Sequence, residues 1–78
     1  MNVGGIELSA KNRGVLKKQV KHLGLSVSEA ARRVGIAQPT LYNILKGDRN
    51  PRRETLKTLC RVLECEVAFT VVEIRPRK

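Results

Sequence analysis

The chain has 78 residues, 41% of them hydrophobic, which suits one small folded domain and excludes disorder throughout. Sixteen Lys and Arg against seven Asp and Glu give a net charge of +9, which favours a polyanionic partner such as nucleic acid or an acidic membrane surface. Two cysteines and one histidine are too few for the usual four-ligand zinc site, and no apolar run resembles a membrane span or a signal peptide. We therefore expect a cytoplasmic protein without metal or other cofactor.

Residues 1–8 read as an N-terminal arm that contains a short extended piece, Ile6–Leu8. Ser9 follows as a candidate N-cap, because its hydroxyl can accept a hydrogen bond from a free backbone N–H. A helix is predicted from about residue 10 to residue 23, with an apolar stripe of Leu16, Val20 and Leu23 at spacings of four and three. The basic residues of this segment are interpreted as a solvated face that attracts DNA only weakly.

Two short helices joined by a tight turn are predicted next. Ser26 and Glu29 have the spacing of a capping box and start a helix that ends at Gly35. A third helix begins near Gln38, tolerates Pro39 in its first turn, and stops at Gly47. Residues 27–45 therefore form a helix-turn-helix pattern.

The residue types at the joint of this pattern fit its geometry. Ala31 is small where the two helices cross, and Gly35 supplies a backbone conformation that is costly for other residues. Val34, Leu41 and Ile44 fix the angle between the helices. The outer face of the third helix then projects from the body and can enter a DNA major groove, which is about 12 Å wide.

The remainder of the chain predicts one more helix and one strand. Leu56, Leu59 and Leu63 form the stripe of a helix over residues 53–63, and residues 66–74 alternate as a strand. A lone strand needs a partner, which is either the same strand of a second chain or Ile6–Leu8, within the chain or swapped. We favour a homodimer whose interface includes this strand, through Val67, Phe69 and Val71; residues 75–78 read as a basic tail.

Residues 25–63 resemble the lambda-repressor-like, or Xre-type, helix-turn-helix family. The resemblance rests on Leu25-Ser26, Glu29-Ala30-Ala31, Val34-Gly35-Ile36, Gln38-Pro39-Thr40-Leu41, Gly47, Asn50-Pro51 and Thr55-Leu56. It implies a mainly α fold, a single four- to five-helix DNA-binding domain over residues 1–78, here with a C-terminal β-strand. The end of the chain is also similar, more weakly, to antidote proteins of toxin–antitoxin modules.

The resemblance also implies site residues. The base-reading positions are Gln38, Pro39, Thr40, Tyr42 and Asn43, and the phosphate-contacting positions are Ser28, Lys46, Arg49 and Arg52. The chain departs from the family at Pro39 and Val27, where many members carry a polar residue that contacts DNA. It also has Val20 and Leu45 where many members bury an Arg–Glu pair, a replacement that need not weaken the joint.

These patterns predict a dimeric, sequence-specific repressor that binds double-stranded DNA. The alternative is an antitoxin that binds and neutralises a toxin protein and regulates its own operon. An RNA-binding or membrane-surface protein is disfavoured, because aromatic residues for base stacking are scarce and the apolar stripes are needed for the core. No arrangement of residues typical of a catalytic site is found, so we expect no enzyme activity.

Overall fold

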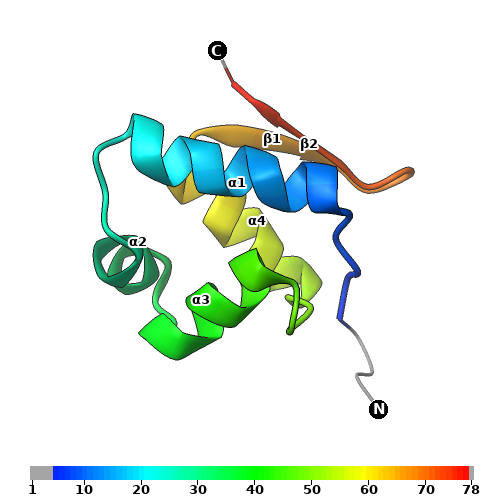
Figure 1. Cartoon of the computed structure of the whole chain (residues 1–78). Coiled ribbons are helices and arrows are strands. Elements are labelled where there is room, and N and C mark those ends of the chain that lie inside the picture. The colour runs from blue at the N-terminus through cyan, green and yellow to red at the C-terminus, as the bar shows by residue number, and fades with distance from the viewer. Residues whose placement is uncertain (1–4, 78) are drawn as a thin grey trace.

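The computed structural model describes residues 5–77 and is mainly helical, as predicted (Figure 1). Four helices precede a C-terminal two-stranded antiparallel sheet, which lies along α1 and α4. In chain order the elements are α1 (Ala10–His22), α2 (Val27–Val34), α3 (Gln38–Lys46), α4 (Arg53–Val62), β1 (Cys65–Ala68) and β2 (Glu73–Pro76). The first residues of the expected N-terminal arm (1–4) and the last residue of the expected tail (78) lie outside the described residues.

The core is aliphatic and is built from the predicted stripes. Each helix contributes one face to the core. The most deeply buried large side chains of the core include Leu16, Leu41, Ile44, Leu56, Leu59 and Leu63. Ala30 and Ala31 are also buried, where their small size lets α2 approach its neighbours closely. This single cluster fixes the positions of α2 and α3 relative to α1 and α4.

The helix ends follow the sequence signals. Ser9 Oγ accepts a hydrogen bond from Asn12 N at 3.1 Å, and Ser26 Oγ accepts one from Glu29 N at 3.0 Å. Gly35 and Gly47 cap α2 and α3 in the left-handed conformation, with φ of 90° and 98°. The predicted starts and stops of these helices are thus confirmed.

The prediction of one continuous strand over residues 66–74 is wrong. The segment forms a hairpin instead, in which β1 pairs with β2 inside the chain and residues 69–72 form the turn. Val67 lies opposite Ile74, so both side chains are on the core side of the sheet. The described part of the expected tail is also different, because Arg75 and Pro76 belong to β2.

A side chain distant in sequence holds this hairpin. The amide of Asn12, on α1, donates to Val72 O and accepts from Ile74 N, both at 3.0 Å. The N-terminal extended piece does not pair with the hairpin strands; Gly5 instead bridges Arg52, and Ile6 N donates to Pro51 O at 2.7 Å. The strand therefore has its partner within the chain, and the expected pairing with Ile6–Leu8 of the same chain is not formed.

Both cysteines are buried as free thiols. Burial raises the pKa of the Cys60 thiol to about 12, with a smaller contribution from Cys65, and burial also raises the pKa of Cys65. Both therefore stay protonated at neutral pH and pack as small hydrophobic side chains.

No helix within residues 5–77 is long and apolar enough to cross a membrane, and the same residues hold no cluster of His, Cys, Asp and Glu suited to a metal ion.

Candidate nucleic-acid interface

The α2–α3 joint is closed by backbone hydrogen bonds. Gly35 N and Ile36 N both donate to Ala31 O, at 2.8 and 3.0 Å, and this arrangement turns the chain sharply at the end of α2. α3 starts three residues after Gly35, with Pro39 in its first turn, where a missing N–H has no helical partner to lose. The joint thus sets α3 across the front of the molecule, below α1 and beside α2 (Figure 1).

α3 has one buried face and one outer face. Leu41, Ile44 and Leu45 are buried, and the first two are residues expected to fix the angle between the helices. The residues at the opposite face are Pro39, Asn43 and Lys46, which recur at spacings of four and three and so lie along one side of the helix. Gln38 is exposed at the helix N-terminus. On this outer face Pro39 and Lys46 are exposed and Asn43 is half-buried, so the face is accessible to solvent and carries two polar side chains beside the apolar Pro39.

Tyr42 and Lys46 lie on the side of α3 that faces α1. Tyr42 is 53% exposed, and Lys46 Nζ lies 5.4 Å from the centre of its ring. Lys46 also forms an exposed ion pair with Asp48 at 3.3 Å, which offsets part of its charge. The Tyr42 side chain is therefore accessible on this side of α3.

The opposite side of α3 carries a second group of predicted residues. Thr40, Arg49 and Arg52 line a hollow between α3 and the start of α4, and both arginines are exposed. Ser28 is exposed in the first turn of α2, where free N–H groups favour an anion. The structure thus brings the predicted base-reading residues together on α3 and divides the predicted phosphate contacts between its two sides.

The joint between α1 and α3 is apolar. Val20 and Leu45 are 5% and 6% exposed and lie in the floor of a groove between the two helices. No charge is buried at these two positions, so the joint needs no ion pair to offset desolvation.

The three residues expected at a dimer interface lie in or beside the hairpin turn. Val67 is half-buried on the core side of β1, and the guanidinium of Arg53 stacks on the ring of Phe69, 4.2 Å from its centre. Val71 is 77% exposed at the tip. Of the three, only Val71 offers most of its side chain to a partner.

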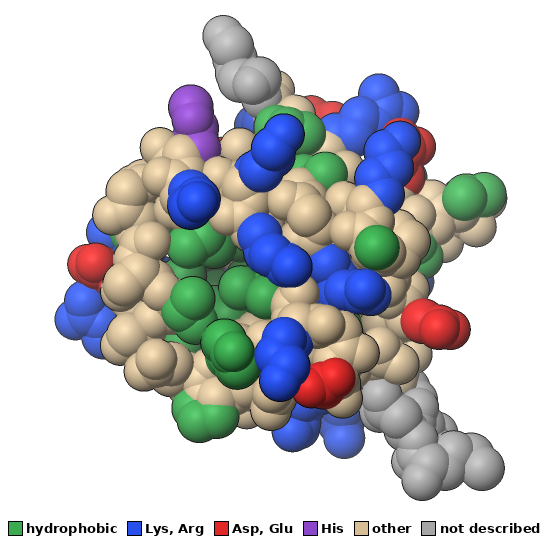
Figure 2. Space-filling model, viewed as in Figure 1, with side chains coloured by type: hydrophobic (Ala, Val, Ile, Leu, Met, Phe, Trp, Pro, Cys, Tyr) green, Lys and Arg blue, Asp and Glu red, His purple; other side chains and the backbone are tan. Residues whose placement is uncertain are grey.

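The lysines of α1 were not among the predicted site residues. Lys17, Lys18 and Lys21 border the groove on the Tyr42 side of α3, and Figure 2 shows a hollow floored by hydrophobic side chains with basic side chains around it. Lys17 and Lys21 are four residues apart and therefore share a face of α1 with Val20 close by. That spacing was readable from sequence, but the element that faces them was not.

Comparisons with known proteins agree with this geometry. A family model described as "Helix-turn-helix" matches residues 16–69, which run from the middle of α1 through α2, α3 and α4 to the hairpin turn. No curated protein matches the chain. The matched range includes every predicted base-reading and phosphate-contacting residue.

Proposed function

The chain belongs to the helix-turn-helix family of Xre or lambda-repressor-like DNA-binding proteins, and on that premise we propose that it is a sequence-specific transcriptional repressor. The observation that carries this proposal is the outer face of α3, which is solvent-accessible, carries the polar side chains of Asn43 and Lys46, and is supported from behind by the core. An α-helix of this kind fits the major groove of duplex DNA. Bound at a promoter in the cytoplasm, the protein would block access of RNA polymerase.

Five of the predicted site residues have a defined chemical role in this proposal. The Gln38 amide can form two hydrogen bonds with adenine. Asn43, five residues further along α3, carries the same amide group. Thr40 can contact a phosphate or a thymine methyl group. Arg49 and Arg52 bind phosphates on one side of α3, which fixes the position of the helix without reading sequence.

We include a homodimer in the proposal. Two copies related by a two-fold axis would place their α3 helices about 34 Å apart, one turn of DNA, and would read a palindromic operator. The support for an interface at the hairpin is the exposed Val71, an apolar side chain at the tip of the turn.

The test is selection of bound duplexes from a random pool, with the wild-type chain and with Gln38→Ala. Wild type should enrich one palindromic sequence. Gln38→Ala should relax the preference at one base position per half-site, at a cost of about 1–3 kcal/mol. Arg49→Ala is the matched control, because losing a phosphate contact weakens all sequences alike. Equal enrichment of all duplexes by the wild-type chain would refute sequence-specific repression.

An antitoxin role is the second candidate. The sequence favours it through the similarity of the chain's end to antidote proteins, although the strand predicted there is paired within the chain. What still supports this role is the exposed hairpin tip at Val71 with basic Arg75 and Arg77 nearby in sequence. Co-purification with the product of a directly adjacent reading frame, lost in Val71→Asp, would support this role. Absence of such a complex would refute it.

A further inference from the structure

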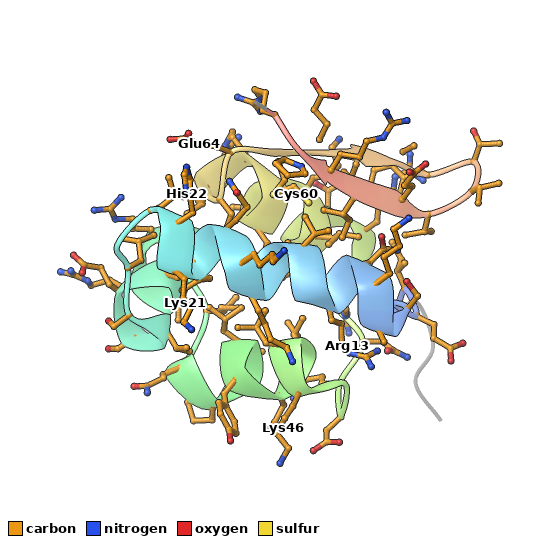
Figure 3. The ribbon with its side chains drawn as sticks, turned by 45° about the horizontal axis from the view of Figure 1, so that its top comes forward. Arg13, Lys21, His22, Lys46, Cys60 and Glu64 are labelled. Carbon is orange, nitrogen blue, oxygen red and sulfur yellow. The ribbon has the colours of Figure 1, made fainter. Side chains whose placement is uncertain are left out.

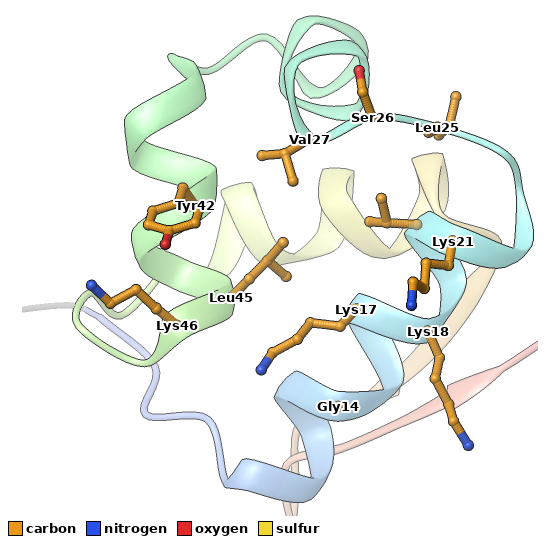
Figure 4. Close-up of a pocket in the computed structure, with 11 residues that line it drawn as sticks. Gly14, Lys17, Lys18, Lys21, Leu25, Ser26, Val27, Tyr42, Leu45 and Lys46 are labelled. Carbon is orange, nitrogen blue, oxygen red and sulfur yellow. The ribbon is translucent and has the colours of Figure 1, made fainter.

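The molecule has a hollow on the side away from the reading helix. The groove between α1 and α3 adjoins that helix (Figure 4), whereas a second hollow lies between α4 and β1. α4 contributes Lys57 and Arg61 to its lining, and the hairpin contributes Val67 and Phe69. Figure 1 shows the hairpin and α3 on opposite sides of the helical body, so a duplex seated on α3 would leave this hollow open.

The outer edge of β2 is closed to further strands. Ile74 N donates to Asn12 Oδ1, and Val72 O accepts from Asn12 Nδ2, both at 3.0 Å. Pro76, the last residue of β2, has no N–H to offer. Side-chain cover and proline are two of the means by which proteins prevent an edge strand from pairing with another chain.

The outer edge of β1 has neither protection. In an antiparallel ladder, pairs that share hydrogen bonds alternate with pairs that do not. Arg77 N donates to Glu64 O at 2.8 Å, so the next pair, which contains Cys65, shares none, and the pair that contains Val67 shares none either. Cys65 and Val67 therefore direct their N–H and C=O groups away from β2. Outside the ladder, no backbone hydrogen bond within residues 5–77 reaches these groups, and the edge of β1 is open beside the hollow.

The rim of the hollow is basic. Lys57, Arg61 and Arg77 are exposed there beside one carboxylate, that of Glu54. No carboxylate in the described part of the chain lies within 4.0 Å of these three cationic groups. Lys57 and Arg61 are four residues apart on α4, a rise of about 6 Å. Side chains two residues apart in a strand are separated by a similar distance, about 7 Å, so carboxylates at alternate positions of a strand have the spacing of these two cations.

We propose that β1 and the hollow bind an extended acidic segment of another protein, which joins the sheet as a third strand beside β1. Main-chain hydrogen bonds to Cys65 and Val67 supply affinity, and Lys57 and Arg61 select carboxylates at alternate positions. A second copy of this chain fits less well, because pairing β1 with itself would bring two basic rims together in chains of net charge +9. The site is independent of DNA binding and leaves α3 free.

The probe is a synthetic ten-residue peptide in which threonine alternates with aspartate and valine, so that the aspartates and valines share one face of the strand. Titration calorimetry should show binding to the wild-type chain at 0.1 M salt. Lys57→Gln and Arg61→Gln should each weaken it about twofold to fivefold. Lys11→Gln, at an exposed position on α1, is the matched control and should leave the affinity unchanged.

Two measurements test the strand pairing itself. The peptide should slow the exchange of the Cys65 and Val67 amide hydrogens with solvent. Val67→Pro removes one outward N–H at a position where an edge strand tolerates proline, and it should abolish binding while circular dichroism shows the helices intact. The same peptide N-methylated at every residue keeps its charges but cannot donate to β1, so it should not bind the wild-type chain either.

Equal binding of the N-methylated peptide, or of a peptide with lysine in place of aspartate, would overturn the proposal, as would no binding of the acidic peptide. Protection of the Cys65 and Val67 amides that grows with protein concentration alone would assign the edge to a second copy. Displacement of the peptide by a random-sequence duplex would assign the hollow to nucleic acid. Either result would also overturn the proposal. Failure of the wild-type chain to bind any duplex, with the peptide still bound, would refute only the proposed repressor function.

Discussion

Asn12 holds the C-terminal hairpin in place, a role that the sequence did not indicate. It is buried in α1, and its side chain forms hydrogen bonds with Val72 and Ile74 of the hairpin, which lie 60 and 62 positions further along the chain. A buried amide satisfied in this way specifies one position for the hairpin, because any other would leave polar groups unpaired. A second buried amide, Gln19, donates to Leu63 O at 2.8 Å and ties α1 to the end of α4.

We predict that Asn12→Ala destabilises the protein by about 1–3 kcal/mol, although alanine is the better helix former, because Ile74 N and Val72 O lose their partner. Urea unfolding monitored by circular dichroism measures this change. Lys11→Ala, the exposed neighbour on the same helix, should change the free energy of unfolding by less than about 0.5 kcal/mol. Equal stability of the two variants would show that the hairpin is held by packing alone.

At the scale of elements, the glycines that end α2 and α3 have different surroundings. Gly35 and Gly47 both have left-handed backbones, but a Cβ at Gly35 would meet open space, whereas at Gly47 it would lie 2.9 Å from Arg13 Cζ. Arg13 donates to Leu8 O and lies beside the loop that follows α3 (Figure 3). The end of α3 is thus packed against a residue of α1 that also anchors the N-terminal segment.

We predict that Gly35→Ala costs about 1–2 kcal/mol from backbone strain alone. Gly47→Ala should cost roughly 0.5–1.5 kcal/mol more, because Arg13 must move and lose its hydrogen bond. Thermal or urea unfolding of both variants gives the difference, and in an Arg13→Ala background the two substitutions should become equal. A smaller loss for Gly47→Ala than for Gly35→Ala would contradict the contact with Arg13.

The elements that sequence predicted well are those with local signals. Ser26, Gly35 and Gly47 mark helix ends through hydrogen bonds and backbone angles within a few residues, and the structure places these ends as expected. The hairpin was missed because its turn, residues 69–72, contains no glycine, proline or asparagine, and the alternation of Val67, Phe69 and Val71 runs straight into it. Its turn is fixed by Asn12, a contact that no local pattern reveals.

In the whole molecule, too, features set by local sequence were predictable and features set by tertiary contacts were not. The predicted site residues of α3 share one helix, so its period of 3.6 residues was enough to place them on accessible faces. Lys17 and Lys21 face the groove only because α1 packs against α3, which is a property of the tertiary fold. Sequence therefore yielded the reading helix and missed the part of the charged surface that another element contributes.

We predict that the protein is a dimer in solution and that Val71→Asp shifts it toward monomer, because a charge at the exposed tip opposes burial in an apolar interface. Analytical ultracentrifugation over a concentration series measures the shift. The monomeric variant should stay folded and bind a half-site with wild-type preference but much lower affinity for the full operator. If Val71→Asp leaves the association constant unchanged, the hairpin tip is not the interface.

The central claim is that the outer face of α3 reads DNA. The most direct measurement is a structure of the chain bound to the duplex it selects. We predict that α3 lies in the major groove with Gln38 and Asn43 at base edges and with Arg49 on the adjacent phosphate strand. A complex in which α3 faces solvent and another surface contacts the duplex would contradict this account.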